Sequence, residues 1–150
     1  MKAAGMLMKI LDPEGGYDAS MLYDEPVFKA ALGKISPAKY KELGEKILNA
    51  FLADHPAGFE DLKTCFADLY RIFTFFLKEE GIGILKSLEF RKGFMKLSDN
   101  LILPCAVTQS AIAALLKKMG LKGVHVKETR CKLDGFKFCE YQAVWISSNV

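Results

Sequence analysis

The sequence predicts an α+β domain in which N-terminal helices pack on a roughly four-stranded antiparallel sheet. Apolar residues recur at helical spacing up to about residue 80, whereas alternation typical of strands dominates after Gly81. One more helical segment interrupts the alternating part. We therefore expect a single domain over residues 1–150: an N-terminal segment and connection at 1–24, a helical part at 25–80, and a part at 81–146 with the sheet and the candidate site.

The composition is that of a globular protein. A chain of 150 residues with 51% apolar and 26% charged residues can build one substantial core. The net charge of +3 is spread over mixed charges and gives no argument for nucleic acid. No apolar stretch approaches the ~20 residues of a membrane span, and 3–11 lacks a cleavage pattern. We expect a cytoplasmic protein with neither nucleic acid nor a membrane as partner.

The first helices follow a stretch with turn signals. Residues 12–24 are rich in glycine, proline and polar residues and are predicted to be a connection. Ser36 offers a capping hydroxyl before Pro37 at the first helical position. The apolar residues that follow recur at helical spacing: Tyr40, Leu43, Ile47 and Phe51. This helix should end near His55-Pro56.

A second, aromatic helix is predicted over about residues 58–80. Its apolar seam is Phe59, Leu62, Phe66, Leu69, Phe73 and Phe76. Further apolar residues widen this surface, so core, a second subunit or a ligand must cover more than one side. Cys65 on this helix is interpreted as a small core residue.

Two hairpins and a helix make up the rest of the chain. Residues 82–97 alternate around a turn at 91–93, and a helix is expected from Cys105 to Met119, with Gly120 as its stop. The second hairpin starts near Gly123 and turns at Asp134-Gly135. Its last strand places three residues on one face: Tyr141, Ala143 and Trp145.

Glu128 is the first sign of a site. It shares strand parity with Val124 and Val126, so it should point inward while His125 and Lys127 point away. A buried, unpaired carboxylate is costly, and a nearby cation is the simplest physical remedy.

Three cysteines are predicted to meet this carboxylate. Cys131 and Cys139 flank the hairpin turn, and Cys105 lies at a helix N-terminus, where the helix dipole favours a thiolate. Strand parity would put Glu128 and Cys131 on opposite faces. The ladder must therefore break or bulge near Thr129 if both are to reach one ion.

Three sulfurs and one oxygen suit tetrahedral Zn(II), and four protein ligands leave no position for an activated water. We therefore expect Cys105, Glu128, Cys131 and Cys139 to hold a structural zinc ion. Spacing alone leaves two alternatives open: free buried thiols, or a Cys131–Cys139 disulfide, which is rare in cytosol.

The same residues carry a family resemblance. Glu128-Thr129-Arg130-Cys131 with Gly135, Cys139 and Tyr141, preceded by Pro104-Cys105, resembles the vinyl-4-reductase domain family from about residue 81 to 145. Earlier residues match only in helical character. In phenol-sensing bacterial regulators of this family, a cysteine, a glutamate and two hairpin cysteines bind zinc, and the four residues above stand in those places. The family is also similar in fold to TRAPP subunits, which use it for assembly.

The resemblance implies a stand-alone sensory or binding module that takes a small hydrophobic or aromatic ligand and acts through a homodimer or a separate regulatory partner. Six aromatic residues could line its pocket, although each is more often core: Phe66, Tyr70, Phe73, Phe76, Tyr141 and Trp145. A second hypothesis is reduction of a tetrapyrrole vinyl group, as reductase or accessory protein. A third is a TRAPP-like assembly subunit. No catalytic residue can be named, since His55 and His125 are isolated and no dinucleotide fingerprint is present.

Overall fold

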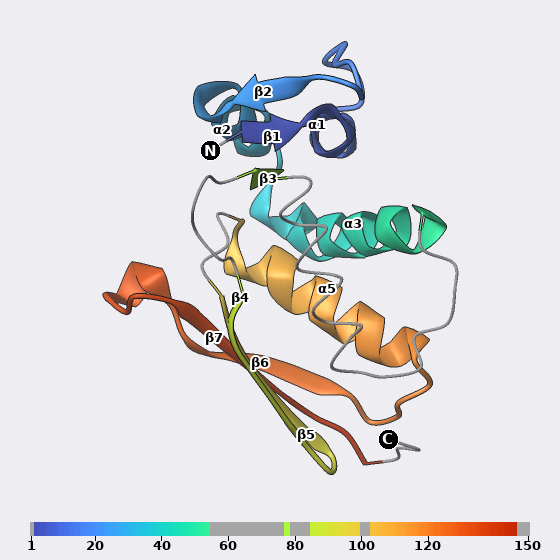
Figure 1. Cartoon of the computed structure of the whole chain (residues 1–150), viewed down its shortest axis with the longest axis vertical. Helices are drawn as coiled ribbons and strands as arrows, with labels where there is room; N and C mark the ends of the chain where they lie inside the picture. The colour runs from blue at the N-terminus through green and yellow to red at the C-terminus, as the bar shows by residue number, and fades with distance from the viewer. Residues whose placement is uncertain (1, 55–76, 79–84, 100–102, 147–150) are drawn as a thin grey trace.

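The computed structural model describes residues 2–54, 77–78, 85–99 and 103–146. It is an α+β domain with two antiparallel sheets (Figure 1). The expected sheet is the larger one, with strand order β4-β5-β7-β6. The expectation of a single sheet was incomplete, because a second sheet has the order β2-β1-β3.

The smaller sheet belongs to the N-terminal unit. Strand β1 (Lys2–Ala4) leads into helix α1 (Gly5–Leu11), and strand β2 (Leu22–Asp24) leads into helix α2 (Glu25–Gly33). β1 pairs with β2 and with β3 (Leu77–Lys78). The stretch predicted as a mere connection thus supplies a strand. The pairing of β2 with β1, which lies 20 residues earlier in the chain, could not be predicted from a local pattern.

The capped helix start is confirmed. The Ser36 hydroxyl accepts a hydrogen bond from Ala38 N, and the 3-10 turn η1 (Pro37–Lys39) continues into helix α3 (Tyr40–Asp54). The predicted aromatic helix lies mostly outside the described residues, with Cys65, Phe66, Tyr70, Phe73 and Phe76. Its predicted end is wrong, because Leu77–Lys78 pair with β1 as strand β3.

The C-terminal half follows the predicted order. It comprises β4 (Leu85–Arg91), β5 (Phe94–Asp99), α5 (Cys105–Lys118), β6 (His125–Arg130), η2 (Lys132–Asp134) and β7 (Cys139–Val144). Helix α5 ends before Gly120, whose φ of 86° suits glycine. Gly135 ends η2 with φ 92°. Both positions were predicted from sequence as a stop and a turn.

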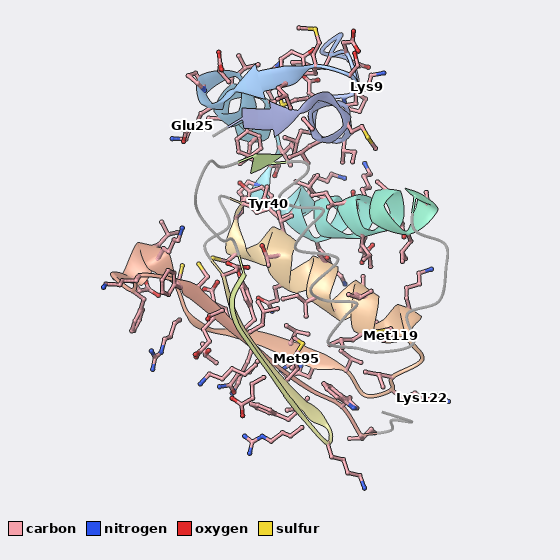
Figure 2. The ribbon with its side chains drawn as sticks, viewed as in Figure 1. Lys9, Glu25, Tyr40, Met95, Met119 and Lys122 are labelled. Atoms are coloured by element: carbon pink, nitrogen blue, oxygen red, sulfur yellow. The ribbon has the colours of Figure 1, made fainter. Side chains whose placement is uncertain are left out.

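Helices α3 and α5 lie one above the other on one side of the larger sheet (Figure 1). They approach closely at Gly44, where an added Cβ would lie 2.4 Å from the Val107 carbonyl oxygen. Met95 lies on the sheet face turned toward α5 and is fully buried (Figure 2). The predicted inner face of β7 is confirmed, since Tyr141, Ala143 and Trp145 are all buried. Part of the core therefore lies between α5 and the sheet.

Candidate metal centre

The four predicted residues come together at one end of the larger sheet. One donor atom from each of Cys105, Glu128, Cys131 and Cys139 can be chosen so that all four lie within 4.8 Å of one another. They come from the first residue of α5, from β6, from the residue after β6 and from the first residue of β7. Figure 2 draws sulfur atoms in yellow where the start of α5 approaches the β6–β7 turn.

The predicted break in the ladder makes this possible. β6 pairs with β7 in regular register up to Glu128↔Tyr141, and the register then shifts before Arg130↔Glu140. Thr129 is the extra residue of this β-bulge. A bulge turns the strand so that residues of opposite parity reach the same side. Glu128 thus faces inward with Val126, and Cys131 follows to the same side, whereas His125 and Lys127 are exposed.

Cys131 and Cys139 are free thiols in this structure, so the alternative of a disulfide between them is not observed. Cys105 Sγ lies 3.5 Å from Cys131 Sγ and 3.4 Å from Cys139 Sγ. A disulfide requires an S–S distance of about 2.05 Å, and all three thiols are free. Tetrahedral zinc with Zn–S bonds of about 2.3 Å holds its sulfurs about 3.8 Å apart. The thiols therefore lie close to the separation that a shared metal ion imposes.

Main-chain N–H groups of the hairpin turn support the sulfurs. Leu133 N donates to Cys131 Sγ at 3.4 Å, and a backbone hydrogen bond from Lys132 lowers the pKa of Cys139. Donors of this kind stabilise thiolate character in a zinc ligand. Burial acts in the other direction and has the larger effect, so the pKa of the Cys139 thiol is raised overall.

The environment of Cys105 disfavours its thiolate form. Burial, followed by a hydrogen bond to Glu128, raises the pKa of its thiol well above the ordinary value. Glu128 Oε2 is buried and has no hydrogen-bond partner among the described residues. A buried carboxylate oxygen beside neutral thiols is poorly satisfied. A divalent cation would provide the missing partner for the oxygen and favour thiolates at the same time.

Two buried neighbours surround the cluster: Tyr141, which belongs to the motif that carries the family resemblance, and Asp99, which the sequence analysis did not single out. Tyr141 is 1% exposed and pairs with Glu128 across the ladder, and its hydroxyl lowers the pKa of Cys105 by hydrogen bonding. Asp99 is 1% exposed and pairs with Cys139, and its charge raises the pKa of that thiol. Parity with Met95 and Leu97 would have predicted the inward position of Asp99. Its position beside Cys139 could be predicted only with knowledge of the strand order, in which β5 pairs with β7.

The predicted ligand-binding residues divide into two groups. Tyr141 and Trp145 are buried on the inner face of β7, whereas Phe66, Tyr70, Phe73 and Phe76 lie outside the described residues.

In the described part of the chain, two more buried polar atoms resemble Glu128 Oε2 in having no hydrogen-bond partner. They are Thr108 Oγ1 in α5 and Trp145 Nε1. Sequence patterns gave no sign of Thr108, which is 1% exposed one turn after Cys105.

Comparison with known proteins places the fold. No family model matches this chain, and no curated protein matches it. An H-NOX protein from S. oneidensis in its Fe(II)NO ligation state has a TM-score of 0.65 at 11% identity, covering 95% of this chain and 87% of that one. An H-NOX structure described for the mechanism of H-NOX activation has a TM-score of 0.64 at 15% identity, covering 98% and 97%. Both likenesses concern the fold alone.

Another structure with this fold is described as probing the function of heme distortion in the H-NOX family, so the described residues bear on whether this chain could hold a heme. Heme iron is held by a histidine, cysteine, methionine or tyrosine that faces the porphyrin on its own. Of the two histidines, His125 is exposed on β6 and His55 lies outside the described residues. The described cysteines converge on one point and enclose it. This donor set fits a small ion such as zinc and does not fit a heme.

Proposed function

We propose that this chain is a zinc-stabilised module that binds a small hydrophobic or aromatic molecule and acts as a sensor. The observation that carries the proposal is the convergence of three free thiols and one carboxylate, with one donor atom from each of the four residues within 4.8 Å of the others. In addition, Glu128 Oε2 is buried without a hydrogen-bond partner among the described residues. Sulfur-rich tetrahedral sets select zinc, and the full set of protein ligands gives the ion a structural role.

Zinc in this position would tie three elements together. It would hold the start of α5 to β6 and to the hairpin turn before β7, which are 23 to 34 residues apart in sequence. Because α5 covers the inner face of the sheet, the ion would fix the layer in which a ligand is expected. No catalytic role follows, since an additional activated water would need a free position on the metal.

Ligand binding is supported by the inner layer itself. Tyr141 and Trp145 are aromatic residues buried there, and Thr108 Oγ1 and Trp145 Nε1 are buried donors without partners. Buried donors are normally satisfied, so a ligand with acceptor atoms would relieve them. The fold shared with H-NOX structures, one of them described in an Fe(II)NO ligation state, is consistent with a sensory role. Signalling through a homodimer or a separate partner belongs to the same proposal.

The first test is metal content. Protein purified without added metal is expected to contain about one zinc per chain, and the Cys131→Ser, Cys139→Ser double variant none. Cys65→Ser is the matched control, because the ligand pattern predicted from the sequence does not include Cys65, so this variant should leave the zinc content unchanged. A native chain without zinc would contradict the proposal.

The second test addresses the ligand. Small phenolic and acyl compounds are screened against the zinc-loaded chain by thermal shift, followed by calorimetry. Thr108→Val and Trp145→Phe remove one buried donor each; valine keeps the shape of threonine, whereas phenylalanine is smaller than tryptophan, so Thr108→Val is the cleaner of the two variants. We expect weaker binding of an oxygen-bearing ligand to both variants and unchanged zinc content. Tight binding of porphyrins in place of these compounds would favour the tetrapyrrole role.

A further inference from the structure

The turn between β6 and β7 presents an apolar apex to solvent. Leu133 is 92% exposed, and Phe136, three residues later, is 47% exposed. Figure 1 shows this turn projecting beyond the end of the larger sheet, next to the start of α5. Large apolar side chains exposed singly are ordinary, but two at the end of one rigid turn form a defined feature.

Cations surround this apex. The tip segment, residues 130–138, contains Arg130, Lys132 and Lys137 against the single acid Asp134. Arg130 stacks over the Phe136 ring at 5.5 Å and lies 3.8 Å from Glu140. Within the described part of the chain, Lys132 and Lys137 form no ion pair. The apex is therefore apolar at its end and positively charged around its base.

A hollow lies beside the tip segment on the outer side of the sheet. It has a volume of about 450 Å³, and Arg130, Phe136 and Lys137 contribute to its lining. The hollow can accommodate an acidic group next to Arg130 and Lys137. Glu140 also lines the hollow, but its carboxylate is paired with Lys96 at 3.3 Å.

The small size of the tip segment favours a membrane surface over a protein as its binding partner. A stable protein interface takes about 800 Å² and 20–30 residues from each partner, whereas the tip segment has nine residues, two of which form the apolar end. A membrane surface requires less: a few apolar side chains that enter the headgroup region, and lysines or arginines that attract anionic lipids. The turn, with apolar side chains at its end and positive charges around them, matches what a membrane surface requires.

We propose that the β6–β7 tip is a peripheral docking element for an anionic lipid surface, with Leu133 and Phe136 entering the headgroup region and Lys132 and Lys137 contacting lipid phosphates. Within the described residues no helix is long and apolar enough to cross a bilayer, and docking at the surface does not require one. This inference goes beyond the proposed sensory function, because it depends on exposure and charge and not on the identity of the ligand.

The experiment is co-flotation of the full zinc-loaded chain with vesicles of phosphatidylcholine and phosphatidylglycerol in equal amounts, compared with vesicles of phosphatidylcholine alone. We expect binding to the anionic vesicles only, weakened by salt. Leu133→Asp should lower the partition coefficient by about tenfold or more. The double variant Lys132→Gln, Lys137→Gln, which removes two positive charges at about 1 kcal/mol each, should lower it by roughly 30-fold.

Ile146 supplies the matched control. It is 88% exposed, just beyond the end of β7 that lies away from the turn. Ile146→Asp therefore changes an equally exposed apolar residue outside the tip and should leave partition unchanged. Circular dichroism and zinc content show whether each variant keeps its fold.

Three results would overturn the proposal. The first is that the native chain fails to float with anionic vesicles. The second is that Leu133→Asp floats as well as the native chain. The third is that Ile146→Asp loses as much binding as Leu133→Asp. A native chain that ignores vesicles but changes from dimer to monomer with Leu133→Asp would identify the tip as an interface between copies and would equally reject lipid docking.

Discussion

The Sγ atoms of Cys105 and Cys139 lie 3.4 Å apart, although 34 residues separate them in sequence. Cys105 begins helix α5 and Cys139 begins strand β7, so this contact joins the helical layer to the sheet. The distance exceeds a disulfide bond and lies just below the sulfur spacing of a tetrahedral zinc site. The following expectations start from this cluster and from the packing around it.

Glu128→Gln tests the oxygen ligand. The amide keeps the shape of the side chain but removes the negative charge, so zinc affinity should fall by about tenfold or more. Competition with a chromogenic chelator measures the affinity. Lys127→Gln is the neighbouring control, since Lys127 is exposed and faces away from the cluster. Equal affinity of native and Glu128→Gln protein would show that the carboxylate is not a ligand.

Zinc binding should release protons. Burial raises the pKa of the Cys105 and Cys139 thiols, so both are neutral at pH 7 in the metal-free chain and must lose a proton to bind zinc. Affinity should therefore rise with pH and fall as pH is lowered. Calorimetry in two buffers of different ionisation enthalpy gives the number of protons. Zinc binding without proton release would contradict the ligand assignment.

Glu140 should contribute pH-dependent stability. Burial raises the pKa of its carboxyl, but the Thr129 hydroxyl, which donates at 2.6 Å, and the charges of Lys96 and Arg130 lower it overall. Because the folded pKa is depressed, the stabilisation is present above the unfolded pKa and is lost as pH falls through the folded value. We expect Glu140→Gln to cost about 1 kcal/mol at pH 7.

Urea unfolding of the native chain and Glu140→Gln, both loaded with zinc, measures this difference from pH 7 downward. The gap in unfolding free energy between the two proteins should narrow as the carboxyl becomes protonated. A gap that stays constant with pH would mean that Glu140 acts through packing and not through charge.

Gly44→Ala should destabilise the chain in spite of the better helix propensity of alanine. The new Cβ would lie 2.4 Å from the backbone oxygen of Val107 and 2.8 Å from the Ser110 Cβ, so α3 and α5 would have to separate. We expect a loss of about 1–3 kcal/mol in thermal or urea unfolding. Gly33→Ala is the control, because nothing lies within 4 Å of its added Cβ. The same loss in both variants would exclude close packing as the cause.

Local patterns predicted several elements in both halves of the chain. The alternation of Val126 and Glu128, the capping hydroxyl of Ser36 and the turn glycine Gly135 each act over a few residues, so the sequence shows them directly. The β-bulge at Thr129 was also predictable, because the chemistry of Glu128 and Cys131 required one side for both residues.

The misses came from contacts between distant segments. Strands β2 and β3 form because both pair with β1. Residues 22–24 and 77–78 are too short to show the alternation of apolar and polar residues that predicts a strand. Asp99 and Tyr141 join the cluster because β5 and β6 both flank β7. Strand order is set by packing over the whole sheet, which no short window contains.

The sequence by itself determined the four candidate ligands and the elements that carry them, because ligand chemistry and strand parity are local properties. Only the tertiary structure decided that one residue from a helix and three from a hairpin meet within 4.8 Å. It also decided that Leu133 is exposed at a projecting tip while Thr108 is buried without a partner. Distance and exposure follow from how separate segments pack, since only packing brings atoms far apart in the chain into contact or leaves them in water.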